Sequence, residues 1–198
     1  MILSHHQARL LESCLAGEGV AVFPTDTVYG LGCAHDSAAA VARLLALKGR
    51  PAGRPLALMV FSLARALELV PWVGVRTHAV LEDLLPGPLT VVLEDPDGRF
   101  GAPTVGLRVP LLPMTLSALV TVERALLQSS ANLTGEPDAR RCEDVAPSIL
   151  SGADLVLDGG ELPGVASTVL DLRSYESDGS WSVVREGAVP RDVLAARL

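Results

Sequence analysis

Lysine, cysteine and aromatic residues are scarce in this sequence. The chain of 198 residues has 16 basic residues, and Lys48 is its only lysine. Its three cysteines are far apart and include no Cys-x-x-Cys pair, so neither a disulfide framework nor a zinc knuckle is expected. Of the four histidines only His5 and His6 adjoin, and neighbouring helix residues point in different directions, so we expect no metal site.

Long apolar runs and net positive charge are also absent. The sequence has no run of about 18 apolar residues and no N-terminal stretch of basic residues followed by apolar ones, which predicts a soluble, cytoplasmic protein without a membrane partner. The balance of 16 basic and 23 acidic residues gives a net charge of −7, and aromatic residues make up 4%. Both values argue against a broad nucleic-acid-binding surface, which needs positive charge and stacking rings.

Four common functional motifs are missing as well. The sequence contains no G-x-x-x-x-G-K-[ST] loop, no G-x-G-x-x-G turn, no G-x-S-x-G elbow and no H-E-x-x-H helix. The standard phosphate-loop, dinucleotide-binding, hydrolase and zinc-protease interpretations are therefore excluded.

Regular alternation of helices and strands is what the sequence does contain. Apolar residues make up 49% of the chain, and no linker, repeat or low-complexity tract divides it, so we expect one domain over residues 1–198. The alternation is typical of an α/β fold, and short connectors between the last strands favour antiparallel pairs, so the sheet should be mixed parallel and antiparallel and flanked by helices. Helices are expected at 4–17, 37–48, 63–70, 77–84, 114–122, 142–150 and after 190, strands at 20–23, 56–61, 89–93, 105–109, 126–129, 154–157, 167–172 and 182–185, a loop at 25–33 and a mobile hairpin tip at 174–180.

The segments that follow the predicted strands are rich in hydroxyl, arginine and glycine residues. In an open α/β sheet ligands bind beyond the carboxyl ends of the strands, so we expect these segments to converge on one site. Arg108 lies in an apolar strand-like run and must find an anion or a carboxylate, because an unpaired buried charge is unfavourable. The segments are PTDTVYGLG at 24–32, KGRPAGRPL at 48–56, PGPLT at 86–90, TVGLRVP at 104–110, SAN at 130–132, STVLD at 167–171 and REG at 185–187.

The order of these segments resembles the YrdC-type L-threonylcarbamoyladenylate synthases, over roughly residues 20–187. The resemblance implies a twisted α/β sheet with a concave, positively charged face, and the short, single-domain form of the family. It implies a nucleotidyltransferase that condenses L-threonine, bicarbonate or CO2, and ATP with its Mg²⁺ into threonylcarbamoyl-AMP and pyrophosphate. Separate transfer proteins would then use the product to modify tRNA.

The same resemblance assigns site residues by their positions in the motifs. Lys48 and Arg50 would be catalytic, by stabilising charge on the phosphates. Two histidines of many relatives are missing, one where this chain has Met59 and one soon after Pro110, and Asp138 stands where a hydroxyl is often found. ATP would be bound by Lys48, Arg50, Arg54, Thr104, Ser130, Asn132, Asp138 and Arg185, and threonine by Thr27, Arg108 and Ser167, with Arg108 as the clamp for its carboxylate.

The residues themselves offer no Ser-His-Asp triad and no histidine placed for general-base work, so the hypothesis is catalysis by positioning and charge. Two alternatives stay open. One is a non-catalytic RNA-binding or ribosome-maturation module with a weak contact to tRNA or other RNA. The other is a related ATP-dependent carbamoylating enzyme with a different acceptor.

Overall fold

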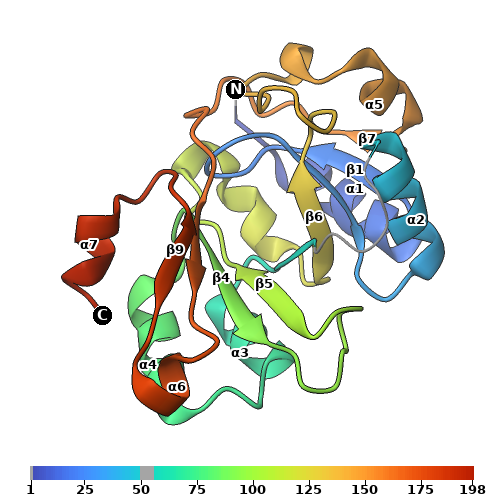
Figure 1. Cartoon of the computed structure of the whole chain (residues 1–198). Coiled ribbons are helices and arrows are strands. Elements are labelled where there is room, and N and C mark those ends of the chain that lie inside the picture. The colour runs from blue at the N-terminus through green and yellow to red at the C-terminus, as the bar shows by residue number, and fades with distance from the viewer. Residues whose placement is uncertain (1, 50–55) are drawn as a thin grey trace.

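A single mixed sheet organises the part of the chain that the computed structural model describes, residues 2–49 and 56–198. Within these residues nine strands are hydrogen-bonded in the order β7-β1-β2-β6-β3-β5-β4-β8-β9 (Figure 1). The strands are β1 (Val20–Phe23), β2 (Gly30–Ala34), β3 (Ala57–Met59), β4 (Leu89–Glu94), β5 (Thr104–Arg108), β6 (Leu126–Ser130), β7 (Leu155–Val156), β8 (Thr168–Asp171) and β9 (Ser182–Arg185).

The strand directions confirm the predicted mixed sheet. The pairs β1–β7, β3–β5 and β4–β8 are parallel, and the other neighbours are antiparallel. The closing strands β8 and β9 pair antiparallel, as their short connector favours. Strand β4 instead pairs with the distant β8, which brings residues 89–92 beside residues 168–171.

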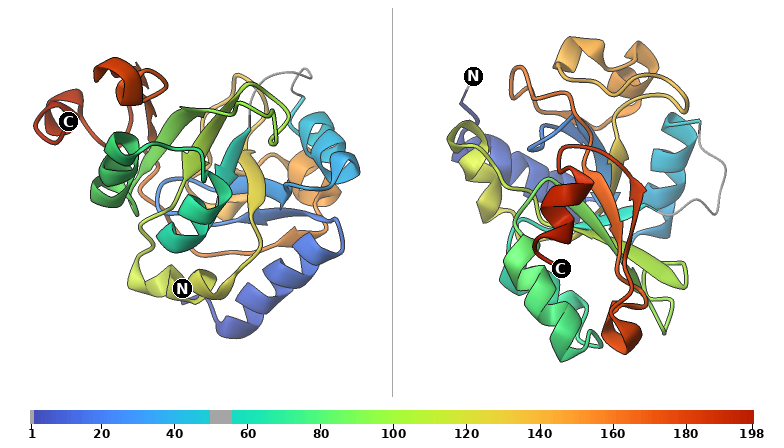
Figure 2. Two further views of the ribbon diagram at one scale, coloured as in Figure 1. Left: turned by 90° about the horizontal axis from the view of Figure 1, so that it is seen from below. Right: turned by 60° about the vertical axis from the view of Figure 1, so that its left-hand side comes forward.

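Helices flank the sheet, and most lie where the sequence pattern predicts them. Ser4 and Gln7 form the expected capping box at the start of the first helix, and the Ser37 hydroxyl accepts a hydrogen bond from Ala40 N at the start of the second. Figure 2 shows the C-terminal helix on the side of the molecule away from the first two helices. The helices are α1 (His5–Ala16), α2 (Ala38–Leu47), α3 (Leu63–Leu69), α4 (Val75–Leu84), η1 (Met114–Thr121), η2 (Cys142–Asp144), α5 (Pro147–Gly152), α6 (Tyr175–Asp178) and α7 (Arg191–Ala195), of which η1 and η2 are 3-10 helices.

Side-chain alternation gives the half of the sheet around β4, β5 and β8 two different faces. Buried side chains at 89, 91 and 93 of β4 and at 105 and 107 of β5 pack with α3, α4 and α7 in one apolar cluster. The intervening positions, including Thr90, Val92, Thr104 and Val169, point to the opposite face and are only partly buried. That opposite face is therefore left open to bind a ligand.

In the other half of the sheet, strands β1 and β2 are buried on both faces. All four residues of β1 are buried, and they pack with α1, α2, η1 and α5 in a second apolar cluster. Strand β2 corrects the prediction of a loop at 25–33. A Cβ atom on Gly32 would lie 2.5 Å from Leu126 Cδ1 and 2.9 Å from Phe23 Cε1, so glycine here permits close packing across the strand and does not mark a turn.

Two further segments differ in part from the predictions, although 174–180 does connect the antiparallel strands β8 and β9 as a hairpin. The helix expected at 142–150 is divided into η2 and α5, because Ala146 precedes Pro147 and takes an extended conformation, as the residue before a proline does. The expected hairpin tip at 174–180 contains the short helix α6, anchored by the buried Tyr175. From α6, Glu176 Oε2 accepts a hydrogen bond of 2.9 Å from Thr77 N in the first turn of α4.

In the described ranges, no helix is long and apolar enough to cross a bilayer.

Candidate active site

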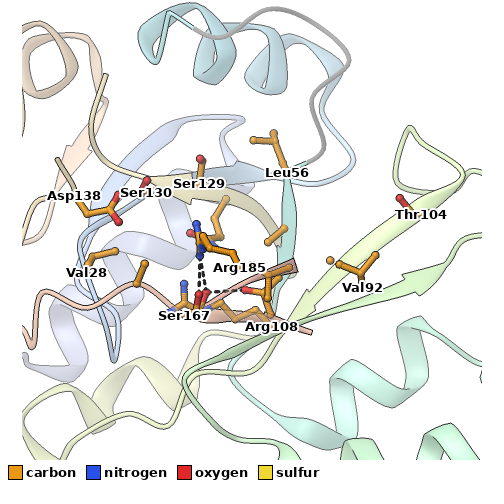
Figure 3. Close-up of a pocket in the computed structure, with 16 residues that line it drawn as sticks. Val28, Leu56, Val92, Thr104, Arg108, Ser129, Ser130, Asp138, Ser167 and Arg185 are labelled. Carbon is orange, nitrogen blue, oxygen red and sulfur yellow. Dashed lines mark hydrogen bonds between the residues drawn. The ribbon is translucent and has the colours of Figure 1, made fainter. Parts of the chain in front are cut away.

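A cavity of about 230 Å³ lies over the open face of the sheet (Figure 3). Its lining includes Arg108, Ser130 and Arg185, the last residues of β5, β6 and β9, as expected for a site at the carboxyl ends of strands. It also extends over side chains from the middle of β4 and β5, which the sequence did not predict. Among the described residues no helix covers this face of β4, β5 and β8, as the alternation of buried and partly buried residues shows. Described residues that line the cavity are Val28, Leu56, Ala57, Thr90, Val92, Thr104, Gly106, Arg108, Gln128, Ser129, Ser130, Asp138, Ala166, Ser167, Val169 and Arg185.

Many of the residues predicted from separate motifs meet in this cavity. Lys48, Asn132 and Thr27 are deeply buried beside it and do not line it. Arg50 and Arg54 lie outside the described residues. The predicted site residues that line the cavity are Thr104, Arg108, Ser130, Asp138, Ser167 and Arg185.

Arg108 is held rigidly at the end of β5. Its side chain is 4% exposed, and Nη2 donates to Asp26 Oδ1 at 2.6 Å and to the hydroxyls of Thr25 and Thr27. Burial lowers the pKa of this guanidinium, and the charge of Asp26 opposes that effect. Among the described residues Nε has no hydrogen-bond partner, so the guanidinium keeps donor capacity beyond its contacts with the loop.

Asp26 is the functional residue that the sequence reasoning missed. Its second oxygen, Oδ2, accepts a hydrogen bond of 3.0 Å from Leu111 N, so the carboxylate ties the loop at 24–29 to both Arg108 and the segment after β5. A signal was present, because a strand-embedded arginine calls for a carboxylate and Asp26 is the acid within the motif PTDTVYGLG. The hydroxyl of Thr27, a predicted threonine contact, also accepts a hydrogen bond from Arg108.

Lys48 ends α2 and points into the turn that follows β6. Its ammonium donates to Ser130 O at 2.6 Å, Asn132 Oδ1 at 2.8 Å, Asn132 O at 3.0 Å and Ser130 Oγ at 3.3 Å. Ser130 Oγ in turn donates to Asn132 Oδ1 at 2.6 Å. The sole lysine thus binds the Ser-Ala-Asn turn and fixes the position of Ser130 at the edge of the cavity.

A second arginine reaches the cavity from β9. Arg185 Nη2 donates to Ser167 O at 2.7 Å and to Ser167 Oγ at 3.3 Å, and the Ser167 hydroxyl lies 2.9 Å from Thr90 Oγ1 (Figure 3). Ser167 is buried, whereas Arg185 is exposed on an edge strand. This chain of contacts joins β4, the start of β8 and β9 along one wall.

Tyr29 connects the loops on the opposite side. Its backbone binds Ala139 O and Ala131 N, and its hydroxyl donates to acceptors in the loop at 158–160 and accepts from Gly159 N at 3.0 Å. Burial raises the pKa of this phenol far above its ordinary range, so it stays protonated and acts as a structural hydrogen-bonding group.

Met59, where many relatives of the resembled family carry histidine, is fully buried in the apolar cluster that also contains Phe61 and Leu116. It shares the sheet face of Ala57, two residues earlier in β3, but it does not line the cavity. In this chain the position contributes packing rather than a polar contact.

A family model described as "Telomere recombination", Sua5/YciO/YrdC, matches residues 13–187. The chain belongs to this family. The match includes every segment that supplies a described cavity residue, and it confirms the resemblance drawn from the motifs.

Two curated relatives of this chain are both named threonylcarbamoyl-AMP synthase. This chain is 32% identical to the threonylcarbamoyl-AMP synthase of Pyrococcus abyssi over 87% of its own length and 51% of that protein. It is 35% identical to the human threonylcarbamoyl-AMP synthase over 91% of this chain and 66% of the human protein. The chain therefore spans about half to two thirds of these relatives.

Solved structures confirm the expected fold. P. abyssi Sua5, crystallised in complex with L-threonine, matches with a TM-score of 0.85 and 28% identity over 100% of this chain and 59% of that one. Escherichia coli YciO matches with a TM-score of 0.78 and 26% identity over 94% of this chain and 92% of that one. Both share the mixed sheet flanked by helices.

Proposed function

We propose that this protein is a threonylcarbamoyl-AMP synthase, which condenses L-threonine, bicarbonate or CO2, and ATP and releases pyrophosphate. The observation that carries the proposal is the meeting of Arg108, Ser130, Ser167 and Arg185, predicted from four separate motifs, in one cavity. The names of the curated relatives and the L-threonine bound to P. abyssi Sua5 support the same activity.

The wall around Arg108 suits the amino acid. A guanidinium binds a carboxylate through paired, charge-assisted hydrogen bonds, and Asp26 holds Arg108 in one orientation for that contact. The Ser167 hydroxyl, already oriented by Thr90 and Arg185, lies in the same cavity and can hydrogen-bond a polar substrate. Carboxylate binding by Arg108 is thus the contact that selects an acid as the acceptor.

The nucleotide is expected on the side of Ser130 and Thr104, and Arg185, which also contacts Ser167, would reach its phosphates from the neighbouring wall. Arg185 is exposed and lines the cavity, so its charge can stabilise phosphates electrostatically. Lys48 supports this side by holding the Ser-Ala-Asn turn, and its contact with phosphate remains a prediction, as do those of Arg50 and Arg54.

Mg²⁺ would enter as the MgATP complex. In the ranges that the structure describes, no group of three or more histidine, cysteine, aspartate or glutamate side chains could hold a metal ion. Mg²⁺ is commonly bound by substrate phosphates and water with few protein oxygens, so a resident metal cage is not needed.

The reaction fits a site that works by positioning and charge. The α-ammonium group of threonine loses one proton to solvent, the neutral amine attacks the carbon of CO2, and the nitrogen releases a second proton to solvent as the carbamate forms. One oxygen of this carbamate then attacks the α-phosphorus of ATP. A new P–O bond forms as the bond to the β-phosphate breaks and pyrophosphate leaves. Holding the reactants together can supply about 7–11 kcal/mol of the barrier. Separate transfer proteins would then carry the product to tRNA.

Pyrophosphate release in the presence of ATP, Mg²⁺, bicarbonate and L-threonine tests the proposal. We expect release that requires all four components and a product with the mass of threonylcarbamoyl-AMP. Release with a different amino acid in place of threonine would favour the carbamoylating enzyme with another acceptor. A salt-dependent shift of RNA without consumption of ATP would favour the RNA-binding module.

A further inference from the structure

One carboxylate faces the cavity. Asp138 is the sole acidic side chain among the described residues that line it, and Figure 3 shows its oxygens directed toward the cavity. Asp138 is half-buried, in the loop between Asn132 and η2. No described residue donates a hydrogen bond to this carboxylate, which contrasts with the tightly paired Asp26.

Two arginine side chains, Arg108 and Arg185, line the same cavity as Asp138. Burial lowers the pKa of Arg108, and the nearby negative charges of Asp26 and, less strongly, Asp138 oppose that shift. The cavity therefore presents both signs of charge to one ligand. An α-amino acid, with a carboxylate and an ammonium group on one carbon, complements that arrangement.

A carboxylate can only accept hydrogen bonds, and it repels phosphate groups. An ammonium group offers three donors and the opposite charge, so it is the better partner for an acid that receives no hydrogen bond from the described residues. We infer that Asp138 binds the α-ammonium group of the amino acid substrate while Arg108 binds its α-carboxylate. The inference rests on the proposed function. It assigns Asp138 to the amino acid, in place of the predicted contact with ATP.

Steady-state pyrophosphate release with Asp138→Asn tests this assignment. The asparagine keeps the shape of the side chain and removes its charge. We expect the KM for L-threonine to rise about 10- to 100-fold, the range for loss of a charge-assisted contact, and the KM for ATP to change less than about twofold. Glu136→Gln is the matched control, because Glu136 is an exposed acid of the same loop whose side chain does not line the cavity.

A substrate analogue gives a second readout. In 2,3-dihydroxybutanoate a hydroxyl replaces the ammonium group, so the wild-type protein should bind it much more weakly than threonine. Asp138→Asn should lose most of that discrimination, which a merely structural role would not change. A raised KM for ATP with an unchanged KM for threonine would overturn the inference and return Asp138 to the nucleotide.

Failure of the proposed function can be told apart from failure of this inference. If the wild-type protein releases no pyrophosphate with threonine, the synthase activity is refuted, and thermal stabilisation by each α-amino acid is measured instead. The inference then stands if one amino acid stabilises the wild-type protein and Glu136→Gln but not Asp138→Asn. It is overturned if none stabilises the wild-type protein.

Discussion

Lys48 and Arg108 are both buried cations, and each is bound by oxygens from a distant segment. Lys48 bridges the end of α2 to the turn at 130–132, and Arg108 bridges β5 to the loop at 25–27. A buried charge is stable only when its partners are close and well oriented, so each cation fixes the geometry of the segment that binds it. These contacts place the loops around the cavity before any ligand arrives.

Replacement of Lys48 by alanine tests the role of the sole lysine. The change leaves the carbonyls of Ser130 and Asn132 without their donor, so the turn loses its anchor. We expect kcat/KM for pyrophosphate release to fall at least about 100-fold and the free energy of unfolding to fall by about 1–3 kcal/mol. Arg43→Ala, which removes an exposed cation from the same helix, serves as the control. Near-wild-type turnover in Lys48→Ala would refute the assignment.

The Arg108–Asp26 pair can be tested by a double-mutant cycle. Asp26→Ala leaves a buried guanidinium without its counter-charge, and such a change costs about 3–5 kcal/mol of unfolding free energy. Arg108→Met likewise leaves the buried carboxylate of Asp26 without its counter-charge. We expect the double variant to lose much less than the sum of the single losses, as measured by chemical denaturation. Additive losses would show that the two side chains do not stabilise each other.

At the level of elements, strand alternation shapes the site. Residues 104, 106 and 108 of β5 lie on the cavity face, and 105 and 107 pack into the apolar core. The alternation itself can be predicted from the sequence. The sequence places the site in the loops after the strands, however, because the open face of the sheet can be recognised only when the positions of the helices are known.

Close packing of the backbone explains why the segment REG at 185–187 ends in glycine. A Cβ atom there would lie 2.3 Å from Ala166 O and 2.6 Å from Ser167 C, so the backbone beside the site would have to shift. We expect Gly187→Ala to lower the free energy of unfolding by about 1–3 kcal/mol and to raise the KM for substrate, because the Arg185–Ser167 contact would be displaced. Gly17→Ala is the control, since its Cβ would meet nothing closer than 3.4 Å. Equal effects of the two changes would contradict this account.

Local signals predicted most elements, and where they failed the cause was local as well. Ser4, Ser37 and the apolar run at 20–23 identified α1, α2 and β1 correctly. The local sequence predicts a loop in place of β2, because the packing of Phe23 and Leu126 against its glycines comes from other strands. The same distant packing hid the partnership of Asp26 with Arg108, which lie 82 residues apart.

For the molecule as a whole, two apolar clusters lie along one sheet. The ionisation of a cysteine buried in one of them provides a measure of whether that cluster is folded. Cys33, in β2, is fully buried in the cluster with α1 and α2, and burial raises its pKa from 9.0 to about 12. The folded protein therefore retains the thiol proton at a pH where the unfolded chain releases it. The contribution of Cys33 to stability is present below pH 9 and is lost as pH rises toward 12.

Chemical denaturation at pH 8 and pH 10 tests this expectation. The wild-type protein should lose more unfolding free energy over this interval than Cys33→Ala does, because only the wild type can ionise the thiol at 33 on unfolding. The comparison within each protein cancels the cavity that the substitution creates. The same pH dependence in both proteins would show that Cys33 does not contribute.

Most helix starts, most strands, the mixed α/β class and the family follow from the order of amino acids alone, because caps, periodicity and ordered motifs are local properties of the chain. The tertiary structure alone decided the strand order, the open face that carries the cavity, and which charges pair. Those features depend on contacts such as Arg108 with Asp26 and Lys48 with Ser130, which form only when segments 80 or more residues apart are packed together. The scarcity of lysine thus acquired its meaning from the fold: the single ammonium group is buried where it binds the turn beside the cavity.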